Sequence, residues 1–184
     1  MTDVDTWSEG SKTYHRVPRS VLTTEIYANQ YVIDSTDEFA ARISQVEDES
    51  VVLLDVGRHR LEDMEAWGIR PLNVYQGMAM HALLDTGLDL NLLIGAAGSG
   101  KTLLSLACAL ELVVEQKRYS KIVVTRSTPP VAEDIGFLPG TEEEKMMPWL
   151  AAIHDNLEAL HEHDDNPEAS MRFALEKGNI QFKS

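Results

Sequence analysis

The chain has a single cysteine, Cys108, in 184 residues, so it cannot form an internal disulfide. That scarcity fits a reducing compartment, and we expect a cytoplasmic protein. No apolar run approaches the roughly 20 residues of a membrane-spanning helix, and the polar, acidic start does not resemble a secretory signal. Basic residues are also few: 16 Lys and Arg face 30 Asp and Glu, a net charge of −14. This charge argues against a broadly basic nucleic-acid-binding surface, although it allows a local basic groove.

Acidic residues gather in short blocks, which we interpret as solvated faces or helix starts. One block, at residues 161–165, reads His-Glu-His-Asp-Asp and contains types that ligate metals. It has neither partner cysteines nor the His-Glu-x-x-His spacing of zinc enzymes. We therefore interpret it as a solvated acidic turn and predict no resident metal there.

The pattern along the chain predicts three regions. Residues 1–16 carry few apolar side chains, and we expect a disordered tail. Residues 17–66 contain short β-like runs, at 26–33 and 51–54, with one or two helical turns across 36–43, and predict a small β-rich connector. Residues 67–184 then form the main domain, beginning with a helix over 74–84 capped by Asn73.

The most informative segment is an eight-residue glycine loop that matches a P-loop at every fixed position. Backbone N–H groups and a helix dipole converge on such a loop and favour a phosphate. Lys101 supplies a full positive charge for the β- and γ-phosphates, and the Thr102 hydroxyl is placed to hold Mg²⁺. We thus predict that ATP with Mg²⁺ binds at Gly95, Ala96, Ala97, Gly98, Ser99, Gly100, Lys101 and Thr102.

The flanking pattern predicts the fold class. Apolar residues 88–94 read as a strand entering the loop, residues 101–117 as a helix, and residues 122–124 as a second strand covered on both faces. Strand, helix and strand make a βαβ unit. Near the C-terminus, Pro167 opens a helix that Gly178 closes, and residues 179–182 begin another strand. We expect an α/β protein whose parallel, P-loop NTPase-type sheet has flanking helices and follows a small β-rich element.

Hydrolysis requires an acid at the end of a later strand, and the sequence shows none downstream of the loop. Residues 51–55 end in Asp55 but precede the loop, so we interpret them as an ordinary buried strand ending at a polar turn. Arg126 follows the second strand, where it could contact phosphate or a nucleic-acid backbone, or anchor a loop as a solvated cation. The catalytic residues stay unassigned, and the chain reads as half of an NTPase site.

Several particular motifs resemble the ATP-binding domain of PhoH-like proteins. They are the glycine loop, Ile-Val-Val-Thr-Arg at 122–126, Asp-Ile-Gly-Phe-Leu-Pro-Gly at 134–140, Glu-Glu-Lys-Met-Met-Pro-Trp at 143–149 and Asp-Asn-Leu at 155–157. The resemblance covers residues 67–184. Asn73 and Gln76 are similar to the adenine-side motif of related helicase-like ATPases, which makes Gln76 a candidate nucleotide contact.

The resemblance implies a cytoplasmic ATPase linked to RNA unwinding or RNA metabolism, with RNA and a homo-oligomer as possible partners. Residues 17–54 resemble the connector that follows a PIN nuclease domain in longer members. On this view the chain is a piece of a larger protein whose acidic strand-end motif lies beyond Ser184. The alternative is a non-catalytic interaction or assembly module that keeps the nucleotide loop without the hydrolytic acid.

Overall fold

The computed structural model describes residues 4–22, 25–34, 38–125, 155–156, 158–160 and 165–183. The chain divides into two compact units, each described here by itself. The first comprises Met1–Met64 and Arg70–Met78, and the second comprises Glu65–Ile69 and Ala79–Ser184. Among the described helices, none is long and apolar enough to cross a membrane.

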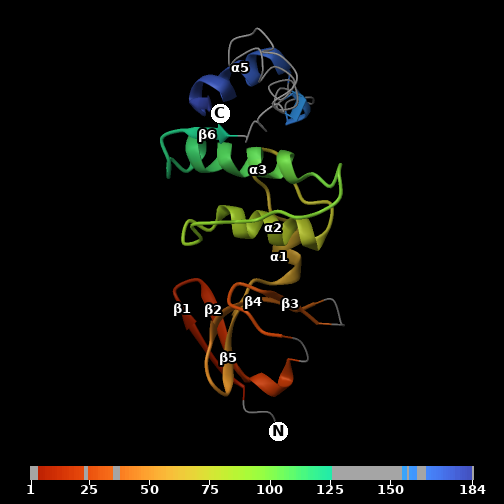
Figure 1. Cartoon of the computed structure of the whole chain (residues 1–184), viewed down its shortest axis with the longest axis vertical. Coiled ribbons are helices and arrows are strands. Elements are labelled where there is room, and N and C mark those ends of the chain that lie inside the picture. The colour runs from red at the N-terminus through yellow and green to blue at the C-terminus, as the bar shows by residue number, and fades with distance from the viewer. Residues whose placement is uncertain are drawn as a thin grey trace, which may run out of the picture. The chain divides into compact units, whose positions relative to one another are not determined.

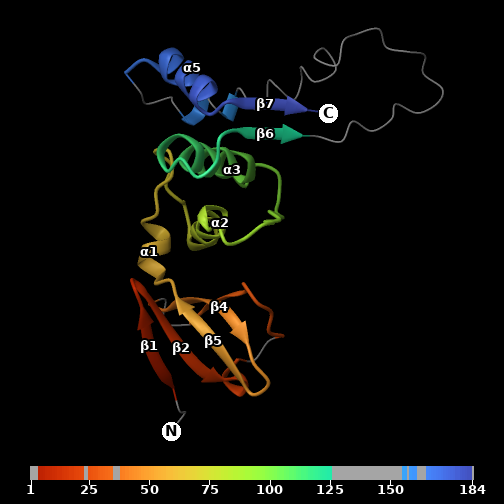
Figure 2. The ribbon, with the colours of Figure 1, turned by 90° about the vertical axis from the view of Figure 1, so that its left-hand side faces the viewer.

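The first unit contains a five-stranded antiparallel sheet with the order β1-β2-β5-β4-β3 (Figures 1 and 2). Its elements are β1 (Asp5–Glu9), β2 (Lys12–Pro18), the 3₁₀ turn η1 (Arg19–Val21), β3 (Tyr31–Ile33), β4 (Ala40–Val46) and β5 (Ser50–Asp55). In the central pairing Tyr14 lies opposite Leu54, and the register between β4 and β5 shifts after Ile43. The expectation of a disordered tail at residues 1–16 is wrong for its described part, because β1 and most of β2 lie there.

Apolar side chains cover both faces of this sheet, which explains why Val51 to Leu54 of β5 are buried in succession. On one face Val51 and Leu53 join a core cluster with Val17 and Ile43. On the other face Leu54 packs in a cluster with Leu61 of helix α1 (Arg58–Glu62) and Val74 of helix α2 (Val74–Leu84). The first turn of α2 therefore belongs to the same core as the sheet.

Helices α1 and α2 approach each other very closely at Gly77. A Cβ added there would lie 2.3 Å from the carbonyl oxygen of Leu61, so only glycine fits. The bounds predicted for α2 are confirmed, and so is its cap: Asn73 Oδ1 accepts from the backbone N–H of Gln76 at 3.0 Å. The predicted helical turns at 36–43 are wrong, because residues 40–43 are the buried start of β4.

The second unit contains α3 (Lys101–Leu110), which continues as the π-helical turn η2 (Glu111–Glu115), then β6 (Ile122–Thr125), α5 (Pro167–Lys177) and β7 (Ile180–Lys183). Strands β6 and β7 run parallel, as Figure 2 shows, with Ile122 opposite Ile180. Leu106 and Leu110 of α3 pack on Ala174 of α5, and Ile122, Val124 and Ile180 pack against them. The predicted strands at 122–124 and 179–182 and the helix opened by Pro167 are confirmed.

The α/β class is therefore confirmed, but the parallel P-loop sheet is not shown. The main sheet is antiparallel, and the described parallel pairing is limited to β6 with β7. The strand expected at residues 88–94 is not formed: this segment has no regular secondary structure, contains a bend at Asp89 and joins no ladder among the described strands. Leu90, Leu92 and Ile94 are 77, 77 and 95 % exposed. A segment becomes a strand only when a neighbour supplies its hydrogen bonds, and no described strand does so.

Candidate nucleotide-binding site

Two glycines give the loop its shape. Gly98 and Gly100 have φ angles of +76° and +82°, in the left-handed region where a side chain costs about 1–2 kcal/mol. Gly100 is also the residue from which α3 begins, and no side chain caps that helix start. The N–H groups of a first helical turn have no partner within the helix, so an anion is the natural partner for them. The glycines predicted to fold around a phosphate thus adopt a conformation suited to that role.

Lys101 is the first residue of α3, and its side chain folds back onto the loop. Its Nζ donates to the carbonyl oxygen of Ala96 at 2.7 Å, to that of Gly95 at 3.0 Å and to Ser99 Oγ at 3.2 Å. The ammonium therefore lies inside the turn of the loop, among the residues predicted to bind phosphate. The sequence assigns this lysine to the loop but does not specify its partners.

Thr102 occupies the second position of α3 and is exposed. Thr102 is therefore a surface residue at the helix end that the loop enters, and its role in holding Mg²⁺ stays a prediction. Among the described residues, no group of three or more His, Cys, Asp or Glu side chains is arranged to hold a metal by itself. A Mg²⁺ at this site would depend on Thr102 together with the phosphate oxygens of a nucleotide.

The rest of α3 anchors the loop in the second unit. Leu104, Leu106, Ala107 and Leu110 are buried, so the helix presents one apolar side to its core. Cys108 lies on the same side, and burial, with a smaller contribution from the charge of Glu111, raises the pKa of its thiol to about 12. The interpretation of Cys108 as a small core residue is confirmed, because the residue is only 1% exposed.

Gln76 belongs to the first unit, whereas the loop belongs to the second. Its Oε1 accepts from the backbone N–H of Leu72 at 2.7 Å, while its own N–H donates to Asn73 Oδ1. The two side chains thus cap the start of α2 reciprocally, much as in a capping box. Contact of Gln76 with an adenine stays a prediction.

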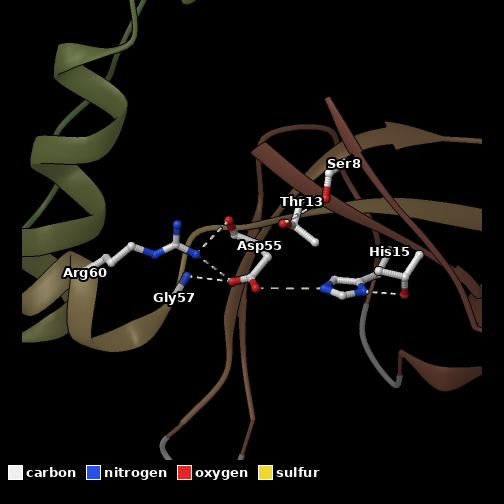
Figure 3. Close-up of polar contacts among 7 residues, drawn as sticks. Ser8, Thr13, His15, Asp55, Gly57 and Arg60 are labelled. Carbon is white, nitrogen blue, oxygen red and sulfur yellow. Dashed lines mark hydrogen bonds and ion pairs between the residues drawn. The ribbon is translucent and has the colours of Figure 1, made fainter. Parts of the chain in front are cut away.

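Asp55 is the acid whose local sequence resembles a strand-end magnesium ligand, and Figure 3 shows its polar contacts with Gly57, Arg60 and His15. Its Oδ1 accepts from the backbone N–H of Gly57 at 2.8 Å and from Arg60 Nη2 at 3.3 Å. Its Oδ2 lies 3.9 Å from Nε2 of His15 on β2. The interpretation of residues 51–55 as a buried strand ending at a polar turn is confirmed. Strand β6 ends at Thr125 without an acid.

Several predicted residues lie outside the described part of the chain. They include Arg126, the Gly-Phe-Leu-Pro-Gly segment and residues 161–164 of the acidic block. Sequence reasoning included Ser99 in the loop but missed the bond between its hydroxyl and Lys101. A hydroxyl two residues before a lysine is compatible with such a bond, but this signal is weak because both side chains have several rotamers.

Comparison with known proteins supports the motif assignment. The family model described as "PhoH-like protein" matches residues 68–183. The protein named PhoH2 of Bacillus subtilis is 44% identical over 134 residues, which are 73% of this chain and 30% of that protein. PhoH2 of Mycolicibacterium smegmatis is 42% identical over 99 residues, 53% of this chain and 23% of that protein. No solved structure matches.

The alignments span less than a third of each of these relatives, so the chain corresponds to part of their length. The region shared with the family model includes the glycine loop, α3, β6 and α5, and it begins just before the capped start of α2. The chain therefore belongs to the PhoH-like protein family.

Proposed function

We propose that this chain binds ATP together with Mg²⁺ through residues 95–102. The observation that carries the proposal is the left-handed conformation of Gly98 and Gly100 immediately before an uncapped helix start whose first residue is Lys101. Backbone conformation, helix dipole and lysine charge all favour an anion at one place. Membership of the PhoH-like family supports the same site.

Each residue has a distinct task in this proposal. The N–H groups of the loop and of the first turn of α3 donate to phosphate oxygens, and the glycines let the backbone approach closely. Lys101 turns its ammonium from the loop carbonyls toward the phosphates. Thr102 places its hydroxyl in the coordination shell of Mg²⁺, which neutralises part of the triphosphate charge when bound.

The direct test is calorimetric titration of the protein with Mg·ATP. Lys101→Ala removes the positive charge from the loop, and we expect binding to become undetectable. The matched control is Lys121→Ala, which removes an exposed lysine of the same unit whose described partner is the surface side chain of Gln181. The control should bind as the unchanged protein does. Equal affinity for Lys101→Ala and the unchanged protein would refute the proposed site.

A second candidate is binding without turnover, as in an interaction or assembly module. The observation that favours it is that β6 ends at Thr125 rather than at an acid able to orient water. A phosphate-release assay on the purified chain separates the two functions. Steady release that Lys101→Ala abolishes supports an ATPase, whereas ATP binding without release supports the module.

The RNA-linked role that the family resemblance implies is a further proposal. A net charge of −14 limits sequence-independent affinity, so contact must come from a local group such as Arg126. We expect retention on immobilised RNA to fall with added salt and to be lost in Arg126→Ala. Retention of equal strength in that variant would remove Arg126 from the interface. The family resemblance also implies a cytoplasmic location and a homo-oligomer, and we propose both.

A further inference from the structure

The three hydrogen bonds of the Lys101 ammonium account for its full donor capacity. An ammonium has three N–H donors and no acceptor. In this loop they point to Ala96 O at 2.7 Å, Gly95 O at 3.0 Å and Ser99 Oγ at 3.2 Å. Lys101 cannot donate to a phosphate without releasing at least one of these acceptors. The loop and the phosphate therefore compete for the same ammonium.

We propose that Ser99 is a positioning residue that sets how firmly the loop retains the Lys101 ammonium and thereby tunes the affinity for nucleotide. The inference rests on the proposed function, because it takes the triphosphate as the competing acceptor. Gly95 and Ala96 contribute main-chain oxygens, which every residue type has. Ser99 contributes the one acceptor of the three that belongs to a side chain, so it is the position at which sequence can adjust the competition.

The geometry supports a contact that the loop is built to allow. A Cβ placed on Gly95 would lie 3.1 Å from Ser99 Oγ and 4.0 Å from Cδ of Lys101, so glycine leaves room for both side chains. The backbone N–H of Ser99 also donates to Ala96 O at 3.4 Å, which ties the serine to the same carbonyl that holds the ammonium. Hydroxyl, carbonyls and lysine are thus linked to one another.

The direction of the effect follows from mass action. When a ligand requires a conformation that is only partly populated, its apparent affinity falls by that fraction. Removing the Ser99 hydroxyl weakens the retained state of Lys101 and leaves its two main-chain acceptors in place. We expect Ser99→Ala to bind Mg·ATP roughly fivefold more tightly, the size of effect expected for the loss of one hydrogen bond of typical net strength. Ser99→Thr keeps a hydroxyl and should restore the original affinity.

The first measurement needs no nucleotide. The purified chain is treated briefly with an amine-acylating ester, and labelling of each lysine is quantified by peptide mass spectrometry. We expect Lys101 to be labelled several-fold faster in Ser99→Ala than in the unchanged protein and in Ser99→Thr. Exposed Lys12 serves as the internal reference. The matched control is Ser105→Ala. In the unchanged protein the Ser105 hydroxyl donates to the main-chain oxygen of Lys101 and makes no described contact with the Lys101 ammonium.

The second measurement is the affinity for Mg·ATP by calorimetry in the same variants. Faster labelling with tighter ATP binding in Ser99→Ala, both reversed by Ser99→Thr, supports the proposal. Unchanged labelling overturns it, and so does faster labelling with weaker binding, which would show that the hydroxyl serves the phosphate. If no variant binds ATP, the proposed function fails, while the labelling still decides whether Ser99 holds the lysine.

Discussion

Replacing Gly77 by alanine has two opposite effects on stability: helix propensity improves, but packing against α1 worsens. The structure indicates that the loss in packing is larger. Alanine in a helix interior is favoured over glycine by about 1 kcal/mol, so propensity alone predicts a more stable protein. The added Cβ would, however, lie 2.3 Å from the Leu61 carbonyl oxygen and 2.8 Å from its carbonyl carbon. Both are main-chain atoms of the last turn of α1, so no side-chain rotation relieves the contact.

Relief requires α1 and α2 to separate by about 1 Å, which loosens the cluster of Leu54, Leu61 and Val74. Overpacking of this kind costs about 1–3 kcal/mol, or more where backbone must move. Because backbone must move here, we take the upper end of this range, about 3 kcal/mol. After the gain of about 1 kcal/mol in propensity is subtracted, we expect Gly77→Ala to lower the free energy of unfolding by about 2 kcal/mol.

Urea unfolding followed by far-ultraviolet circular dichroism measures this change. Gly87→Ala is the matched control, because its added Cβ would meet a side-chain atom rather than backbone, the carboxylate oxygen of Asp85 at 3.2 Å. We expect the control to lie within about 0.5 kcal/mol of the unchanged protein. A Gly77→Ala variant as stable as the unchanged protein, or more stable, would refute the close approach of the two helices.

Four further outcomes follow from the site, from helix α3 that supports it and from the start of α2. Gly100→Ala forces a side chain into a φ of +82°, and the resulting strain of about 1–2 kcal/mol should weaken Mg·ATP binding about 5- to 30-fold in calorimetry; equal binding by this variant contradicts the role of Gly100. Thr102→Ala should abolish the gain in ATP affinity that Mg²⁺ gives, and a Mg²⁺ effect that persists in this variant contradicts the role of Thr102. Burial raises the pKa of Cys108 from an ordinary 9.0 to about 12 in the folded protein, so the thiol of the unfolded chain loses its proton at a lower pH. The free energy of unfolding should therefore fall between pH 9 and 12, by on the order of 2–4 kcal/mol more in the unchanged protein than in Cys108→Ala. Parallel pH profiles of the two proteins would contradict that burial. Gln76→Glu keeps an acceptor for the Leu72 N–H and should retain the melting temperature, whereas Gln76→Ala should lose about 1 kcal/mol of capping; equal melting of the two variants contradicts the cap.

The elements that the sequence predicted well are those whose signals are local. Helix α2 has both bounds as predicted, because Asn73 supplies the cap and Gly87 follows its end. Helix α5 likewise begins at Pro167, with Asn166 Oδ1 accepting from the N–H of Ala169 at 3.2 Å. A cap and its helix lie within one or two turns of each other, so a short window contains all the relevant information.

Strand predictions failed where pairing decides the outcome. Residues 40–43 read as helical, but β3 and β5 pair with them on either side, and the buried sheet overrides their helix propensity. Residues 5–9 read as disordered, yet Glu9 pairs with Lys12 across a two-residue turn in which Gly10 has φ +58°. A Gly-Ser turn between polar strands is a real hairpin signal, but too weak to outweigh the lack of apolar residues.

The candidate site shows a different limit of sequence reasoning. The motif identifies Lys101 and Gln76 as ligand-binding types, and both are instead engaged with the backbone, Lys101 with Gly95 O and Ala96 O and Gln76 with the N–H of Leu72. A motif specifies which hydrogen-bonding groups a site has, but not the internal hydrogen bonds that must break before those groups can bind a ligand. Binding at such a site is an exchange of hydrogen bonds, so its free energy is a difference between two satisfied states. Substitutions that weaken the internal partner, as at Ser99, should therefore raise affinity, whereas those that remove the shared donor, as at Lys101, should abolish it.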